Sequence, residues 1–212
     1  MIKYIKGRDV DEQKWNACVN TSAFPLIYGN VWYLDLVCHE WDALIYGDYE
    51  AVLPLPYKTK LGLHYLYRPY GVQQLGVFGD STLAEALLDA IPKKFVWTDI
   101  FLNAENPSVA KKGKFAAQQN LILDLNRSYE QIYEGYSSQT RRNLKKAKKT
   151  KFSTFGFESP EALINLFKQN KGSETTLKES HYKKMTQIMH TLMHKNLGYI
   201  SALYVEPNHL CA

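Results

Sequence analysis

One series of predicted elements occurs twice in this chain, and this repeat limits how the chain can fold more than any other feature. Residues 2–57 and residues 152–212 are each expected to form a strand, two helices and a β-hairpin. The two hairpin sequences are alike, Ala-Leu-Ile-Tyr-Gly-Asp-Tyr-Glu-Ala-Val from residue 43 and Ala-Leu-Tyr-Val-Glu-Pro-Asn-His-Leu-Cys-Ala from residue 202. Strands that alternate with helices in this way predict an α/β protein with a mixed sheet.

Capping residues mark the expected helix starts. Capping boxes are read at Asp9, Thr82, Ser128 and Thr176, and Ser159 precedes a proline at the first helical position. The expected helices cover residues 9–20, 31–40, 82–91, 128–147, 159–170 and 176–194. Apart from the first hairpin (residues 42–56), the expected strands are residues 2–6, 63–70, 95–102, 121–125, 152–157, 199–205 and one that begins at residue 210.

The repeat also predicts the domain organisation. Residues 103–119 are polar and contain Asn-Pro and Lys-Lys-Gly, which is typical of a linker. The first copy continues to residue 115, whereas nothing follows the second hairpin. We therefore expect a complete first domain at residues 1–115 and the N-terminal part of a second, truncated domain at residues 116–212, because a sheet that stops at a hairpin leaves an edge and a face uncovered.

The positive charge is concentrated in one segment. The chain of 212 residues has 26 Lys and Arg against 21 Asp and Glu, a net charge of +5. Residues 137–151, Ser-Ser-Gln-Thr-Arg-Arg-Asn-Leu-Lys-Lys-Ala-Lys-Lys-Thr-Lys, hold seven of those cations and no acid. The remainder of the chain therefore has 19 cations against 21 acids. Such a local cluster attracts phosphates or other anions, although a charge run can also be only a solvated helix face.

Two features together resemble the GNAT acyltransferase fold, and within it the Fem-like aminoacyltransferases with tandem GNAT-like domains. The first is the order β-α-α-β-β-β-α-β. The second is the segment from Leu121 to Phe152, with its motif Thr140-Arg-Arg-Asn-Leu-Lys-Lys-Ala. The resemblance implies one complete GNAT-like domain, a partial second one, and transfer of an acyl or aminoacyl group from a thioester or ester donor to an amine. The implied donor is acyl-CoA or an aminoacyl-tRNA.

Site residues are expected in three groups. The basic segment supplies the cations to contact a phosphate-bearing small molecule or a charged tRNA. A second group gathers after one strand and is a candidate substrate pocket. The third group matches part of the loop that holds coenzyme A phosphates in GNAT enzymes, although Phe78 stands where that loop has Gly or Ala. The phosphate-contacting group is Arg141, Arg142, Lys145 and Lys149. The candidate pocket group is Tyr67, Arg68, Tyr70, Gln73 and Gln74. The loop group is Gln73, Gly76 and Gly79.

Two other functions stay open beside the transferase. One is a non-enzymatic module that binds anions or nucleic acid through residues 137–151, and the other is a catalytically silent GNAT-like protein. No residue pattern identifies a catalytic base, and His190 and His194 lack the glutamate of a zinc-protease motif, so no metal is expected. Short apolar runs and three scattered cysteines predict a cytoplasmic protein that does not insert into a membrane.

Overall fold

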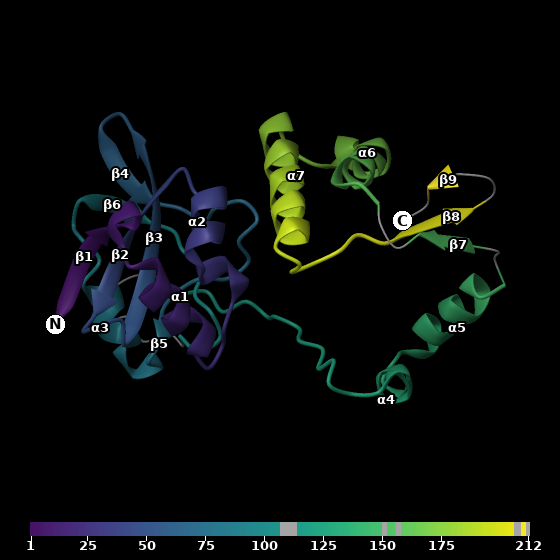
Figure 1. Cartoon of the computed structure of the whole chain (residues 1–212), viewed down its shortest axis with the longest axis horizontal. Helices are drawn as coiled ribbons and strands as arrows, with labels where there is room; N and C mark the ends of the chain where they lie inside the picture. The colour runs from purple at the N-terminus through teal and green to yellow at the C-terminus, as the bar shows by residue number, and fades with distance from the viewer. Residues whose placement is uncertain (107–113, 150–151, 156–157, 206–208, 211–212) are drawn as a thin grey trace. The chain divides into compact units, whose positions relative to one another are not determined.

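The computed structural model describes residues 1–106, 114–149, 152–155, 158–205 and 209–210 (Figure 1). The chain divides into two compact units, residues 1–115 and 116–212. Each unit combines helices with a β-sheet, so the protein is α/β with a mixed sheet, as the sequence predicted. The two units are described separately.

Unit 1 is built on a sheet with strand order β1-β2-β3-β4-β6. Its strands are β1 (Ile2–Lys6), β2 (Glu40–Tyr46), β3 (Ala51–Lys60), β4 (Leu63–Leu66) and β6 (Phe95–Thr98). Neighbours are antiparallel from β1 to β4, whereas β6 runs parallel to β4. A short strand, β5 (Phe78–Gly79), pairs with the beginning of β3.

Helices cover both faces of this sheet. On one face, helix α1 (Glu12–Thr21) lies over β3 and β5 and α2 (Val31–Val37) lies over β2, and the rings of Trp15 on α1 and Trp41 on β2 are 5.3 Å apart. Helix α3 (Ala84–Asp89) covers the other face, where Leu87 packs in a core that includes Leu44 and Leu53. Trp41 and Leu44 lie on opposite faces because successive strand side chains alternate.

Unit 2 repeats the first elements of unit 1. Strand β7 (Phe152–Phe155), helices α6 (Pro160–Asn170) and α7 (Glu179–His194), and strands β8 (Ala202–Val205) and β9 (His209–Leu210) follow in that order. The pairing is also the same, because β8 is antiparallel to both β7 and β9, as β2 is to both β1 and β3. Two short helices, α4 (Tyr129–Glu134) and α5 (Ser138–Ala147), precede β7.

Several predicted boundaries are wrong, two of them because a neighbouring aspartate provides the cap. Asp11, not Asp9, accepts a hydrogen bond from the Lys14 amide and begins α1. Asp80 caps a 3₁₀ turn at Ser81–Leu83 where a capping box at Thr82 was expected. Helix α2 ends at residue 37, β4 and β6 are shorter than predicted, and the N-cap of α7 is residue 178. The caps at Ser128 and Ser159 are confirmed.

Two predictions for unit 2 are also wrong in kind. Residues 121–125 form no strand, and the side chain of Leu121 is 85% exposed and that of Leu125 75% exposed. The helix expected through residues 128–147 is interrupted between Gly135 and Ser137, where the cap of α5 begins. Helical spacing predicts that Leu144 and Ala147 lie on a buried face, but Ala147 is exposed. Because these apolar side chains are exposed and do not pack on other residues of a sheet, their composition alone does not produce a paired strand.

A glycine substitution tests how tightly β5 lies against β3. Gly79 has a φ of +90°, and a Cβ there would lie 2.3 Å from the carbonyl oxygen of Glu50 and 2.8 Å from Cys18 Sγ. Gly62 has a φ of +77° and open space around it. We expect Gly79→Ala to lower the free energy of unfolding by about 3 kcal/mol and Gly62→Ala by about 1 kcal/mol in denaturant titrations. Equal losses would contradict this packing.

Candidate functional site

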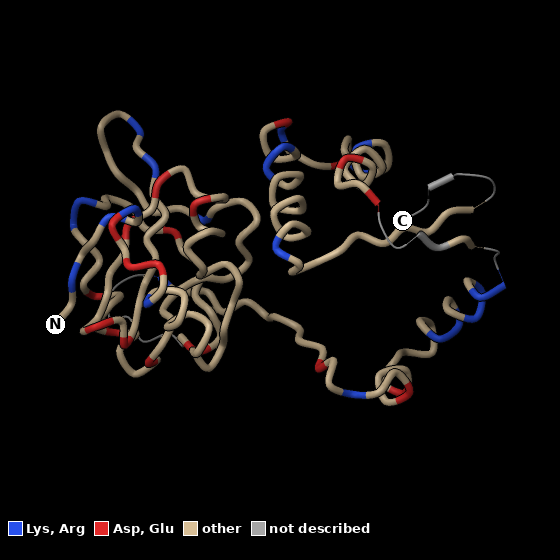
Figure 2. The backbone as a smooth tube through the Cα atoms, in the orientation of Figure 1, with Lys and Arg blue, Asp and Glu red and all other residues tan. Residues whose placement is uncertain are grey.

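Helix α5 presents most of the basic segment as one charged surface. Ser137 begins the helix by accepting a hydrogen bond from the amide of Thr140 at 3.1 Å. Arg141, Arg142, Lys145 and Lys146 then fall within an arc of about 140° of the helix circumference, and Lys148 and Lys149 follow the helix end. Figure 2 shows the resulting run of Lys and Arg along α5. The four predicted phosphate-binding residues therefore lie in one short segment, with Lys149 just beyond the helix.

Among the described residues, the cations of this segment lack acidic partners, unlike two lysines elsewhere in unit 2. Lys168 pairs with Glu179 at 2.8 Å, and Lys171 pairs with Glu174 at 2.9 Å. Within the described ranges, no acid lies within ion-pair distance of the six cations from Arg141 to Lys149. Because like charges on one helix repel each other, an added anion would lower the electrostatic energy here.

Three tyrosines lie on α4 or in the short link between α4 and α5. The rings of Tyr129 and Tyr133 are 6.0 Å apart, and those of Tyr133 and Tyr136 are 5.9 Å apart. The i, i+3, i+4, i+7 spacing of Tyr129, Ile132, Tyr133 and Tyr136 predicts a buried helix face. Tyr129 is instead 55% exposed, and Tyr133 and Tyr136 are half-buried. Tyr136 immediately precedes the cap of α5. Aromatic surface therefore adjoins the basic helix in the chain, a combination that reading the basic segment alone did not indicate.

A small pocket lies where β4 and β6 end. Strand β3 pairs with β5 through Val52 and with β4 from Tyr57 onward, and the stretch between contains two prolines. The prolines suit this gap because they cannot donate a hydrogen bond to a sheet ladder. The pocket lies against this gap and is lined by Leu53, Pro54, Tyr67, Arg68, Pro69, Val72, Leu75, Gly76, Ile100 and Phe101.

The predicted pocket residues are only partly brought together. Tyr67 and Arg68 line this pocket, whereas Tyr70, Gln73 and Gln74 are outside its lining. The guanidinium of Arg68 lies 3.0 Å from Asp99 and 4.5 Å from the centre of the Phe101 ring. The enclosed space is ≈ 10 Å³, which is about the room that one water molecule needs. In this conformation the pocket holds no larger ligand.

Gly76 and Gly79, expected in a phosphate-binding loop, have packing roles in the structure. A Cβ at Gly76 would lie 2.2 Å from Asn106 Oδ1, which accepts a hydrogen bond from the Val77 amide. The amide of Asp80 donates to the carbonyl oxygen of Glu50. The backbone amide that follows each glycine is thus bound to a protein oxygen. Gln73, the third predicted residue, is exposed.

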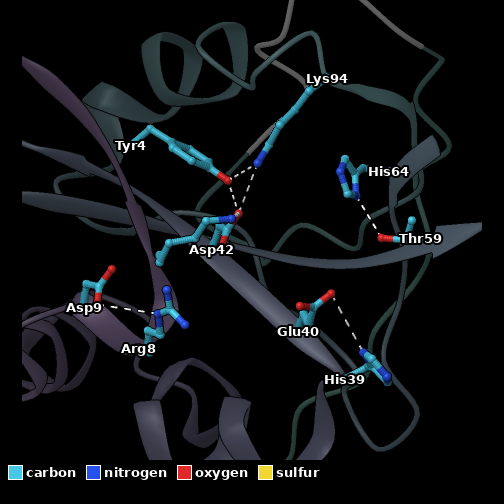
Figure 3. Close-up of polar contacts among 10 residues, drawn as sticks. Tyr4, Arg8, Asp9, His39, Glu40, Asp42, Thr59, His64 and Lys94 are labelled. Atoms are coloured by element: carbon cyan, nitrogen blue, oxygen red, sulfur yellow. Dashed lines mark hydrogen bonds and ion pairs between the residues drawn. The ribbon is translucent and has the colours of Figure 1, made fainter. Parts of the chain in front are cut away.

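A buried carboxylate forms a second polar cluster, which sequence reasoning missed. Asp42 on β2 is 1% exposed, and its Oδ2 atom lies 3.1 Å from Lys6 Nζ and 3.3 Å from Lys94 Nζ (Figure 3). The hydroxyl of Tyr4 donates to the same oxygen and accepts from Lys94. The only signal in the sequence was an acid inside an apolar strand. Together these contacts join β1, β2 and the segment before β6.

Burial disfavours the charged forms of Asp42 and Lys6. It raises the pKa of the Asp42 carboxyl, and the hydrogen bond and positive charge of Lys94 reduce that rise. Burial, followed by repulsion from Lys94, lowers the pKa of the Lys6 ammonium. Lys94 also lies 4.5 Å from the ring centre of Tyr4 and 4.8 Å from that of Phe95. The cluster is therefore a compact ion network at the edge of the core.

Metal-binding geometry is not found in the described part of the chain, where no group of three or more His, Cys, Asp or Glu side chains could hold an ion. His190, one of the two helix histidines, instead lies 2.8 Å from Glu161, and this contact lowers the pKa of the glutamate. Cys18 and Cys38 are buried, and neither is part of a disulfide. Within the same described residues, no helix is long and apolar enough to span a bilayer.

Comparison with known proteins does not identify a family. No protein-family model matches the chain, and no curated protein or solved structure shows significant similarity to it. Functional inference therefore depends on the geometry of the two units.

Two aspartates with similar ion pairs allow a test of the buried cluster. Asp48 lies 2.7 Å from Lys14 but is exposed, whereas Asp42 is buried. We expect Asp42→Asn to lower the free energy of unfolding by about 2 kcal/mol, because two ammonium groups lose their carboxylate. Asp48→Asn should cost clearly less than Asp42→Asn, since water screens that pair. Urea titrations measure both, and an equal cost would show that Asp42 is not a network centre.

Proposed function

We propose that α5 binds the phosphate groups of a polyanionic ligand, and that the chain is a GNAT-like, Fem-like transferase whose acyl or aminoacyl donor carries those phosphates. The observation that carries the proposal is the set of six cations from Arg141 to Lys149 with no acid at ion-pair distance among the described residues. Arginine suits two-point contact with phosphate, and lysine adds point charge.

The tyrosines of α4 favour a nucleic acid as the phosphate-bearing ligand. Tyr129 exposes more than half of its side chain, and Tyr133 and Tyr136 continue the aromatic row toward the cap of α5. Bases stack on such rings while cations contact the backbone, and this pattern tolerates many sequences. A charged tRNA offers both bases and phosphates, so it fits this combination better than a small phosphorylated metabolite does.

The transfer reaction is supported by the arrangement of unit 1. Its element order is β1-α1-α2-β2-β3-β4-α3-β6, with the two-residue β5 between β4 and α3, and this order resembles the GNAT fold. Strands β4 and β6 are parallel, and the pocket lined by Tyr67 and Phe101 lies beyond their carboxyl ends. Ligands of α/β proteins commonly bind at such ends. A substrate group larger than one water molecule would have to open this pocket to enter it.

Two alternatives to the transferase agree with the same observations and need a direct test. A binding module without catalysis needs only the segment from Tyr129 to Lys149, which contains the cations without acidic partners and the tyrosines. A catalytically silent GNAT-like protein would keep the unit 1 fold while its pocket stays at its present ≈ 10 Å³. Binding and transfer must therefore be measured separately.

A double substitution tests binding. Arg141→Gln with Arg142→Gln should weaken binding of tRNA at least tenfold in fluorescence anisotropy and reduce the slope of log affinity against log salt by about 2, since two phosphate contacts are lost. Lys178→Gln with Lys183→Gln removes the same charge from α7 and its cap and should change neither quantity. Unchanged tRNA affinity in the arginine variant would contradict the role of α5.

A transfer assay tests the reaction. The chain is incubated with labelled aminoacyl-tRNA or acyl-CoA and a mixture of primary amines, and amide products are followed by mass spectrometry. We expect amide formation with at least one donor, and the arginine variant should raise KM for that donor more than it changes kcat. Tight tRNA binding without any amide product would favour the binding module instead.

A further inference from the structure

The hairpin formed by β3 and β4 projects from unit 1. Leu61 and Gly62 join the two strands, and Lys60 pairs with Leu63 across the turn. The last three residues of β3 and the first residue of β4 are exposed, whereas the first seven residues of β3 are buried. Figure 1 shows the hairpin extending beyond the rest of the unit. Its turn is therefore well placed to meet a flat partner.

The tip of this hairpin is apolar. Leu61 is 93% exposed and Leu63 is 55% exposed. The φ of Leu61 is +52° and that of Gly62 is +77°, and a turn of this kind favours asparagine, aspartate or glycine. Leucine at this position costs turn stability and gains almost nothing by burial within the unit. A contact outside the unit would explain the leucine.

Exposed apolar side chains continue from the tip onto the neighbouring strand. Trp97 is 68% exposed and pairs with Tyr65, and the bulge in the β4–β6 ladder places Val96, 59% exposed, on the same face as Trp97. Alternate residues of a strand and paired residues of neighbouring strands share a face. Leu63, Tyr65 and Trp97 therefore lie on one face of the sheet. A contiguous exposed apolar surface of this kind marks a contact with a partner.

The charges of the hairpin favour an anionic partner. Lys60 pairs with Leu63 and Lys58 with Tyr65, so both lysines lie on the face that carries the exposed apolar side chains. Lys58 Nζ is 4.3 Å from the ring centre of Tyr67. Among the described residues, neither lysine has an acid at ion-pair distance. Residues 51–79 contain no Asp or Glu, so this part of the unit lacks negative side chains that would repel an anion.

We infer that the β3–β4 hairpin docks peripherally on a bilayer that contains anionic lipids. Leu61 and Leu63 enter the boundary between headgroups and acyl chains, and Lys58 and Lys60 extend to the lipid phosphates. The ring of Trp97 suits the same boundary. Aliphatic side chains gain from contact with hydrocarbon but give bases no ring to stack on, so this surface fits lipid better than nucleic acid. No segment has to cross the bilayer, and the inference does not depend on the ligand proposed for α5.

Vesicle binding by the whole chain tests the inference. The cations of α5 also attract anionic lipid, so the measurement uses a chain with Arg141→Gln and Arg142→Gln as its background. We expect this chain to sediment with phosphatidylcholine vesicles that contain phosphatidylserine, and much less with vesicles of phosphatidylcholine alone. Adding Leu61→Ser with Leu63→Ser should lower the vesicle partition coefficient by about tenfold, because two apolar side chains no longer leave water while the charge is unchanged.

Two further double variants separate the apolar contribution from the charge. Leu121→Ser with Leu125→Ser is the matched control, because these leucines are 85% and 75% exposed but Asp124 lies between them, and it should leave the partition coefficient unchanged. Lys58→Gln with Lys60→Gln should lower the coefficient by about tenfold and reduce its dependence on salt. An unchanged circular dichroism spectrum shows that each variant keeps its fold.

Two results would overturn the inference. One is a chain that does not sediment with phosphatidylserine vesicles, including the case in which a soluble acidic protein or a nucleic acid binds instead and is lost in the hairpin leucine variant. The other is vesicle binding that persists unchanged in that variant, because charges elsewhere would then hold the chain on the lipid.

Discussion

Pairing along β3 is the constraint on which unit 1 depends. This strand pairs with β2 over seven residues and, on its other side, with β5 and then β4. Leu53 and Leu55 are fully buried on the α3 face, and each contributes about 2 kcal/mol through burial. The prolines at 54 and 56 lie where β5 has ended and β4 has not begun. Between Val52 and Tyr57, this side of β3 has no paired strand. The pocket at the carboxyl ends of β4 and β6 lies against this unpaired stretch and is lined in part by Leu53 and Pro54.

Charge is organised differently in the two units. In unit 1 the ammonium groups of Lys6 and Lys94 surround the buried Asp42, so their charge is used to hold strands together. In unit 2 the cations of α5 have no such acid among the described residues. A charge that is already paired adds little attraction for a ligand, whereas a series of unpaired charges attracts a polyanion over a distance set by salt screening. This contrast is why α5, and not the Asp42 cluster, carries the proposed function.

Local signals in the sequence located two helix starts correctly and placed others a short distance from the true cap. The caps at Ser128 and Ser159 formed as expected because a serine hydroxyl needs only a backbone amide two or three residues away. The prediction failed at Asp9, since Asp11 offers the same chemistry two residues later and the chain first makes a 3₁₀ turn. Residues 121–125 have strand composition, but strand formation requires a partner backbone that composition cannot supply.

The sequence by itself determined the repeated order of elements, the α/β class and the concentration of cations in residues 137–151, because these follow from periodicity and composition. Only the tertiary structure decided which side chains meet. It placed Lys94 on Asp42, separated by 52 residues, and brought Phe101 beside Arg68 at the ends of two parallel strands. It also assigned Gly76 to contact with Asn106. Such contacts depend on strand register and crossover connections, which pair distant residues and leave no periodic trace along the chain.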